Sequence, residues 1–169
     1  MSHPESFAST PKPSAIDLFS GCGGLTEGLK QAGIDVIGAI EINALAAETY
    51  TTNHPDTTLW QRDIRFVGSD EIIDKLSLTK GSLDLLAGCP PCQGFSAIRT
   101  LNGSKQISDL RNDLIFEFLR IVRDLRPRVV MLENVPGLEY NYRFTKFCNS
   151  LRRLGYHVKF KILDASQYG

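Results

Sequence analysis

Two cysteines lie three positions apart in the segment AGCPPCQGFS, residues 87–96, with two prolines between them. Cys89 and Cys92 have the spacing of a redox pair, of half a zinc site, or of one nucleophile beside an inert thiol. A redox pair usually begins a helix, whereas the sequence after Cys92, QGFSAIRTLNGS, is a poor helix former. Zinc would need two further ligands, and Cys148 and the three histidines are scattered. We therefore favour a nucleophilic Cys92, with a Cys-x-x-Cys oxidoreductase as the alternative and no metal site.

A glycine-rich turn and several carboxylates come directly after short apolar segments. The sequence DLFSGCGGLTEG, residues 17–28, has glycines that let a backbone approach a ligand, and it leads into a helix N-terminus. It lacks the full dinucleotide fingerprint and also suits the carboxylate of an amino-acid-derived cofactor. Glu41 ends the next apolar segment, where a ribose-binding carboxylate is expected. Asp63 and Glu133 end further segments, and each alone could be a solvated strand end.

Predicted strands and helices alternate along the chain. The apolar, β-prone segments predict strands over residues 15–19, 35–41, 57–64, 82–88, 126–134 and 157–163. Helical spacing predicts helices over residues 25–33, 43–53, 69–76, 113–125 and 143–155, with Asn43 as one cap and a Ser or Asp capping the helix at 69. Residues 99–109 are polar and aperiodic and predict a loop. This alternation predicts an α/β fold with a doubly wound, mostly parallel sheet, in which ligands bind beyond the carboxyl ends of the strands.

Length and composition fit one domain. The chain has 169 residues, of which 42% are hydrophobic and 22% charged. No apolar run approaches the roughly 20 residues of a membrane span. We expect residues 1–13 to be a disordered lead-in and residues 14–169 to form the domain. Without a secretory signal, the four cysteines indicate reduced thiols and an intracellular protein.

Charge is divided unevenly along the chain. Residues 1–110 carry 8 Lys and Arg against 13 Asp and Glu, whereas residues 111–169 carry 11 against 6. A basic segment can face a polyanion such as nucleic acid, but solvated helix faces and strand ends explain the same charges. Charge alone therefore favours no partner.

Four segments together resemble a known family. DLFSGCGG, GCPPCQGFS, DLRNDLIFEFLRIV and ENVPGL look like the signature segments of the cytosine carbon-5 DNA methyltransferase family, in the family's order and at compatible spacing. The resemblance runs from about residue 14 to residue 169. It implies the Rossmann-like fold of S-adenosylmethionine-dependent methyltransferases and a role in DNA methylation, including that of restriction–modification systems.

The resemblance also implies S-adenosylmethionine as the cofactor. Phe19 would stack on the adenine, and Glu41 would hold the ribose hydroxyls. The other residues that the family places around the cofactor are Gly21, Cys22 and Gly24 at the amino-acid part, Asp63 and Ile64 at the adenine, and Pro91 and Leu114 in the wall.

For catalysis the resemblance implies a covalent mechanism. The Cys92 thiolate would add to carbon 6 of cytosine, Glu133 would hold N3, and Asn134 would orient the Glu133 segment. The target base would have to be flipped out of the duplex. Residues 93–109 would then form a closing loop with Gln93, Ser96 and Arg99 at the nucleic acid, and Cys89 would be a packing residue or neutral neighbour.

The family's pattern continues beyond ASQYG, the last residues of the chain. It adds a Gln-x-Arg-x-Arg segment, a final strand between the strands at 126–134 and 157–163, a target-recognition domain and a C-terminal segment. We therefore expect a sheet truncated before its final strand, and activity only with a complementing C-terminal half. Alternatives are an inactive cofactor-binding or regulatory fragment and an enzyme acting on transfer RNA. The expected compartment is the cytoplasm or nucleoid of a bacterium, or the nucleus of a eukaryote.

Overall fold

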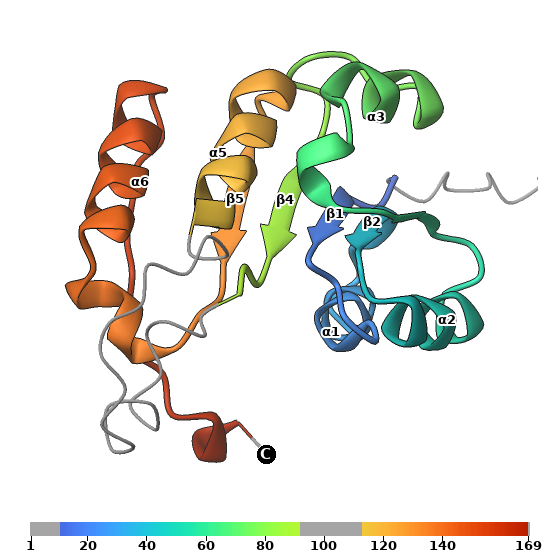
Figure 1. The fold of residues 1–169 in the computed structure, drawn as a ribbon, viewed down its shortest axis with the longest axis horizontal. Coiled ribbons are helices and arrows are strands. Elements are labelled where there is room, and N and C mark those ends of the chain that lie inside the picture. Colours follow the sequence, from blue (N-terminus) through green and yellow to red (C-terminus); the bar gives the residue numbers. More distant parts are fainter. Residues whose placement is uncertain (1–10, 92–112, 169) are drawn as a thin grey trace, which may run out of the picture.

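The computed structural model describes residues 11–91 and 113–168, which form a parallel sheet covered by helices (Figure 1). The strands are β1 Ser14–Leu18, β2 Asp35–Glu41, β3 Thr58–Gln61, β4 Leu85–Gly88 and β5 Val129–Leu132. The α-helices are α1 Gly24–Gln31, α2 Ala44–Asn53, α3 Ser69–Lys75, α5 Leu114–Leu125 and α6 Tyr142–Arg153. The short 3-10 helices are η1 Ile64–Phe66, η3 Pro136–Tyr140 and η4 Ala165–Gln167. In the part described, no helix combines the length and apolar character needed to cross a membrane.

The sheet has five strands in the order β3-β2-β1-β4-β5, and all its pairings are parallel. The chain winds outward from β1 to β2 and β3, and then returns to place β4 and β5 on the other side of β1. This topology confirms the predicted doubly wound α/β fold. Its switch point lies between β1 and β4, which is where such sheets bind ligands.

Alternate residues of β1 belong to two separate hydrophobic cores, one on each face of the sheet. Ile16 and Leu18 of β1 lie in the larger core with the buried face of α5, which includes Phe118. Ala15 of β1 lies on the opposite face and packs with Leu29 of α1. The central strand β1 is therefore buried on both faces, which explains its nearly continuous apolar character.

Gly88, at the end of β4, allows an unusually close approach to β1. A Cβ atom at this position would lie 2.6 Å from the carbonyl oxygen of Leu18 and 3.0 Å from the ring of Phe118. Because neither group can move without disturbing the sheet, only glycine fits. The close approach brings the segment that follows β4 to the end of β1.

Helix ends were predicted with mixed success. The Asn43 side chain accepts a hydrogen bond from the backbone N–H of Ala46 at 3.0 Å, which confirms Asn43 as the cap of α2. The predicted side-chain cap of α3 is wrong: its N-cap is Gly68, and no side chain caps it. The hydroxyl of Ser69 instead donates to Asp124 at 2.7 Å, because α3 packs against α5.

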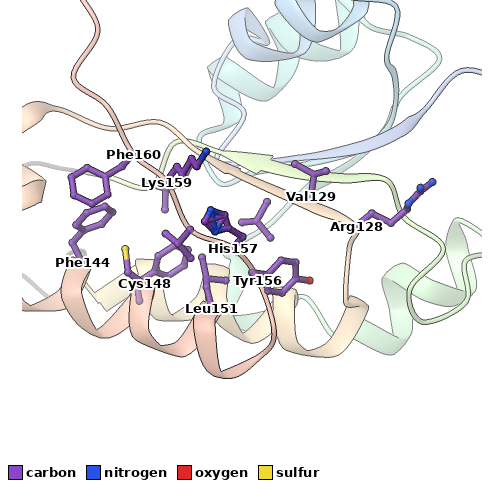
Figure 2. A pocket seen from close by; sticks show the side chains of 13 residues that line it. Arg128, Val129, Phe144, Cys148, Leu151, Tyr156, His157, Lys159 and Phe160 are labelled. Carbon is purple, nitrogen blue, oxygen red and sulfur yellow. The ribbon is translucent and has the colours of Figure 1, made fainter.

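One prediction at the β5 end of the sheet is wrong. The strand predicted over residues 126–134 does form as β5, which is the edge strand of the described sheet, and Val129 is 55% exposed. Residues 157–163 were expected to form a strand, yet they belong to no strand, because alternation alone gives no partner for backbone hydrogen bonds. A mainly apolar groove lies between β5, α6 and residues 156–160 (Figure 2). Its volume is about 360 Å³. None of the predicted site residues lines this groove.

Candidate active site

The carboxyl ends of neighbouring strands lie at one edge of the sheet (Figure 1). Most of the predicted site residues that the structure describes lie at or just after these strand ends. Leu18, the last residue of β1, is paired with Gly88 at the end of β4, and Gly88 is paired with Leu132 at the end of β5. The strand ends therefore lie at the same level. The residues at this edge are Phe19, Glu41, Cys89 and Glu133.

The turn between β1 and α1 has an unusual backbone. Phe19, Gly21 and Gly23 all have positive φ angles, of 60°, 55° and 96°. Glycine adopts such angles readily, whereas a bulky residue such as Phe19 does so at an energetic cost that the surroundings must offset. The N–H of Ser20 donates to the carbonyl of Ile40 at 3.1 Å, which fastens the turn to β2.

The glycines of the turn differ in the space around them. A Cβ atom at Gly21 or Gly24 would meet no described atom within 4 Å, whereas one at Gly23 would lie 2.4 Å from Nε2 of His54. The turn is thus packed against α2 at Gly23 and open at Gly21 and Gly24. An open backbone next to the N-terminus of α1 can approach a ligand that carries an anionic group.

Glu41 supports the turn directly. Its Oε2 accepts a hydrogen bond from the N–H of Gly21 at 2.8 Å, and its Oε1 accepts from the N–H of Asn43 at 2.7 Å. Each carboxylate oxygen can accept a second hydrogen bond. The half-buried Glu41 can therefore hold the turn and still accept from hydroxyl groups of a ligand.

Asp17 is a buried carboxyl group on β1, next to the turn. Its Oδ2 accepts from the hydroxyl of Thr26 at 2.7 Å, and the hydroxyl of Tyr50 lies 2.9 Å from the Thr26 oxygen. Among the described residues, Asp17 Oδ1 and the buried hydroxyl oxygen of Ser20 have no hydrogen-bond partner. Because buried polar atoms are normally satisfied, this pair is consistent with a site for a polar ligand.

Burial sets the ionisation of Asp17. Loss of hydration raises its pKa from 3.8 to about 6, and the hydrogen bond from Thr26 opposes this change. Between these two pH values the folded chain holds more protons than the unfolded chain. The free energy of unfolding therefore decreases as the pH rises through this window.

Replacing Asp17 by asparagine is expected to remove this pH dependence. A pKa difference of two units corresponds to roughly 3 kcal/mol, so the variant should gain up to that much relative to the wild type between about pH 4 and about pH 7. Chemical denaturation at both pH values measures the difference in unfolding free energy. Asp56→Asn, in an exposed turn, is the matched control and should show a constant difference. A constant difference for Asp17→Asn as well would contradict the prediction.

Asp63 and Ile64 follow the edge strand β3. The Asp63 carboxylate accepts from the backbone N–H of Arg65 at 2.9 Å and pairs with the Arg65 side chain, which lowers the pKa of Asp63. Ile64 is 3% exposed and packs in the larger core. The residue after Asp63 is therefore anchored in the core.

The other predicted cofactor residues differ in exposure. Cys22 is exposed, whereas Pro91 and Leu114 are half-buried. Leu114 begins α5, the helix that covers the larger core. Its position at the first turn leaves it partly accessible, whereas Ile115, Phe118 and Leu119 further along α5 are buried.

Asn134 links two chain segments at the site. Its Nδ2 donates to the carbonyl of Pro90 at 2.8 Å, and its Oδ1 accepts from the N–H of Val135 at 2.9 Å. Glu133, the preceding residue, is exposed, and its N–H donates to the carbonyl of Gly88 at 3.1 Å. The Glu133 segment and the segment that leads to Cys92 are therefore held together.

Cys89 is a neutral thiol at physiological pH. Burial, and then the negative charge and hydrogen bond of Glu133, raise its pKa to about 12. A redox Cys-x-x-Cys pair depends on a thiol whose pKa is lowered, so this environment argues against an oxidoreductase. It also means that the Glu133 carboxylate lies close to the thiol of Cys89.

The remaining predictions fall outside the described residues. They concern Cys92, Gln93, Ser96, Arg99 and the loop at residues 99–109.

Several arginines of the basic half are engaged within the fold. Arg120 pairs with Glu117, Arg128 pairs with Asp84, and Arg143 pairs with Asp113. Three of the eleven basic residues in 111–169 therefore have carboxylate partners within the described part of the fold.

Some residues near the edge were not predicted. Ile42, directly after Glu41, is 64% exposed and could cover an apolar part of a ligand. Ile42 could have been predicted from the sequence, because this isoleucine directly follows a carboxylate that ends a predicted strand. Asp17 also had a signal, since it is a charged residue within the apolar run AIDLF. His54 and Arg120 had none, because their contacts depend on tertiary packing.

Comparison with known proteins gives a consistent family match. The sequence profile of the family described as C-5 cytosine-specific DNA methylase matches residues 14–169. The rat protein named DNA (cytosine-5)-methyltransferase 1 is 39% identical over 177 aligned residues, which cover 98% of this chain and 11% of the rat protein. Type II methyltransferase M.XorII of Xanthomonas oryzae is 32% identical, with coverage of 94% of this chain and 38% of M.XorII.

Solved structures give the same result. A prophage-encoded Escherichia coli protein, described as a DNA modification methyltransferase, superposes with a TM-score of 0.70 at 34% identity. The superposition covers 84% of this chain and 38% of that protein. The chain thus spans well under half the length of these relatives and matches them over nearly its own full length.

Proposed function

The chain belongs to the C-5 cytosine-specific DNA methylase family, and we propose that it provides the cofactor site and the catalytic residues for methyl transfer to carbon 5 of cytosine in DNA. The observation that carries this proposal is the link from Asn134 to the carbonyl of Pro90. It holds Glu133 beside the segment that leads to Cys92, at the same edge as the glycine turn.

The proposed cofactor is S-adenosylmethionine, which supplies an electrophilic methyl group when bound. The open turn at Gly21 and Gly24 fits its amino-acid part, and the unpartnered Oδ1 of Asp17 adds negative charge for an ammonium group. Glu41 has lone pairs free for two ribose hydroxyls. Phe19 and Ile42 offer apolar surfaces for the adenine. The donors and acceptors of the edge therefore fit the cofactor.

Cys92 is the proposed nucleophile. As a thiolate it forms a bond to carbon 6 of the cytosine, which makes carbon 5 electron-rich enough to attack a methyl group. Glu133, in its protonated form, donates a hydrogen bond to N3 and passes the proton to N3 as negative charge moves into the ring. After methylation, carbon 5 loses its proton and the Cys92–carbon 6 bond breaks, which restores the thiolate and the aromatic ring.

DNA is the proposed substrate, since the rat relative and M.XorII carry the names of a DNA methyltransferase and a type II methyltransferase. Carbon 5 lies inside a duplex, so the cytosine must be flipped out. Phosphate contacts do not read sequence, and target choice needs contacts to base edges. We propose that a C-terminal segment of the kind present in the longer relatives supplies those contacts, in the same chain or in a second one.

A methyl-transfer assay tests this proposal. The chain is incubated with S-adenosylmethionine carrying a tritiated methyl group, with unmethylated duplex DNA or with transfer RNA. Each reaction is run with and without the C-terminal part of a relative such as M.XorII. The expected result is label at carbon 5 of cytosine in DNA, dependent on the added part. If label appeared only in transfer RNA, the substrate would be transfer RNA and not DNA. Failure to bind S-adenosylhomocysteine would reject the proposed cofactor site.

Glu41→Gln is expected to weaken cofactor binding about 10- to 100-fold. The amide keeps one oxygen acceptor, but its NH₂ group cannot accept from either the N–H of Gly21 or a ribose hydroxyl, and hydrogen bonds to charged groups contribute about 1.5–3 kcal/mol. Calorimetric titration with S-adenosylhomocysteine measures the affinity. Glu48→Gln, on an exposed position of α2, is the control and should bind like the wild type. Equal affinity for all three proteins would remove Glu41 from the ribose site.

A further inference from the structure

Arg120 lies on α5, yet its side chain reaches the segment that follows β3. We propose that Arg120 is a positioning residue that sets the adenine side of the cofactor site. This inference rests on the proposed function, because it assigns a role toward the same cofactor. It concerns a side chain that is expected to touch neither the cofactor nor the cytosine.

The segment between β3 and α3 lies beyond the edge of the sheet. β3 is the edge strand and pairs only with β2 in the described sheet. The segment leaves the sheet, makes the short helix η1, and carries Asp63 at its start. Ile64 and Val67 anchor its side chains in the core, but the backbone must also be held if Asp63 is to stay in place.

Arg120 provides that support through two backbone carbonyls. Its Nη2 donates to the carbonyl of Ile64 at 2.9 Å and to the carbonyl of Val67 at 3.1 Å. The first of these carbonyls belongs to the residue directly after Asp63. One nitrogen of the guanidinium thus fixes both ends of η1 relative to α5.

The other nitrogens of Arg120 fix the guanidinium itself. Nε donates to Glu117 at 2.8 Å, and Nη1 donates to the hydroxyl of Ser69 at 3.3 Å. Ser69 in turn donates to Asp124 at 2.7 Å. The Arg120 side chain is 30% exposed, so water competes only in part for these contacts. A planar group with five donors suits this arrangement, whereas a lysine would present a single point of donation.

The same helix also carries Leu114, which is expected in the cofactor wall. Because Leu114 and Arg120 are both on α5, Arg120 fixes Asp63 relative to Leu114. Arg65 pairs with the carboxylate of Asp63 and governs its side chain, while Arg120 governs the backbone beneath it. Loss of Arg120 should therefore disturb recognition of the adenine more than binding of the amino-acid part at the glycine turn.

Two ligands that differ only at the base separate this role from general stability. S-adenosylhomocysteine carries the 6-amino group of adenine, whereas S-inosylhomocysteine carries an oxygen there. The wild-type chain should prefer the adenine compound, since the Asp63 carboxylate can accept from an amino group but not from a carbonyl. The ratio of the two dissociation constants reports the geometry of the adenine side.

The experiment compares Arg120→Met, Arg120→Lys and the control Arg123→Met by calorimetric titration with both ligands. Arg123 is an exposed residue on the same helix. We expect Arg120→Met to weaken binding of S-adenosylhomocysteine about tenfold and to bring the preference for adenine close to one. Arg120→Lys should fall between that variant and the wild type. Arg123→Met should match the wild type in both affinity and preference.

Two results would overturn the inference. One is an Arg120→Met variant that keeps the wild-type preference for adenine. Any fall in its affinity would then affect both ligands equally and would reflect a general structural effect. The other is an Arg120→Lys variant that binds S-adenosylhomocysteine with wild-type affinity and prefers adenine as strongly as the wild type. This variant decides the question if circular dichroism shows that Arg120→Met is unfolded. Failure of the wild-type chain to bind S-adenosylhomocysteine would instead reject the proposed cofactor site, and the inference with it.

Discussion

Replacing Cys92 by serine is expected to abolish methyl transfer. A serine hydroxyl is a far weaker nucleophile than a thiolate near neutral pH, so carbon 6 would not be attacked and carbon 5 would stay unreactive. Loss of the nucleophile in another covalent enzyme slows turnover on the order of 10⁶-fold, which is below detection here. Transfer of a tritiated methyl group to duplex DNA, with the C-terminal part present, measures this loss.

Cys89→Ser is the matched control for Cys92→Ser, because the two cysteines share one short segment. The Cys89 thiol is neutral, with a pKa raised to about 12, and serine preserves a hydrogen-bond donor beside Glu133. Its activity should stay within a few-fold of the wild type. Activity in Cys92→Ser, or its loss in a folded Cys89→Ser protein, would show that the nucleophile is wrongly assigned.

The second large effect is expected at Glu133. Glu133→Gln keeps the size of the side chain but removes the charge and the ability to exchange a proton at N3 of the cytosine. Positioned acid–base groups contribute about 10²- to 10⁴-fold, so single-turnover methyl transfer should slow by a factor in that range. Binding of S-adenosylhomocysteine should be unchanged, since Glu133 follows β5 and the glycine turn follows β1.

Glu139→Gln is the control for Glu133→Gln, because Glu139 lies in η3, only six residues further along the chain. It should transfer methyl groups at the wild-type rate. If Glu133→Gln slowed transfer less than about threefold, or weakened cofactor binding as much as it slowed transfer, Glu133 would not act on the cytosine ring.

The sequence was sufficient for most of the fold, because local patterns and packing agree. The strand predicted at residues 35–41 coincides with β2, and the helix at 43–53 begins after its predicted Asn43 cap. Residues 157–163 had the same kind of local pattern, but a strand also needs a neighbour for its backbone hydrogen bonds. Ser69 likewise had the right type for a cap and bonds Asp124 instead.

Site residues could be predicted where a sequence motif places them at the end of a strand. They could not be predicted where their role depends on contacts between residues far apart in the sequence. Glu41 ends β2 and Glu133 follows β5, so the order of elements places both at one edge. The bond from Glu41 to the N–H of Gly21, and that from Arg120 to the carbonyl of Ile64, join residues far apart in sequence. No periodicity records such contacts, because they arise only when the elements pack.

The most direct test of the account is covalent trapping on 5-fluorocytosine. Fluorine at carbon 5 blocks the final elimination, so an enzyme that uses a thiolate stays attached to the DNA. With S-adenosylmethionine and the C-terminal part present, we predict a protein–DNA adduct that mass spectrometry maps to Cys92 and that Cys92→Ser does not form. Measurable methyl transfer to ordinary cytosine, without any adduct on the fluorinated base, would contradict the covalent mechanism.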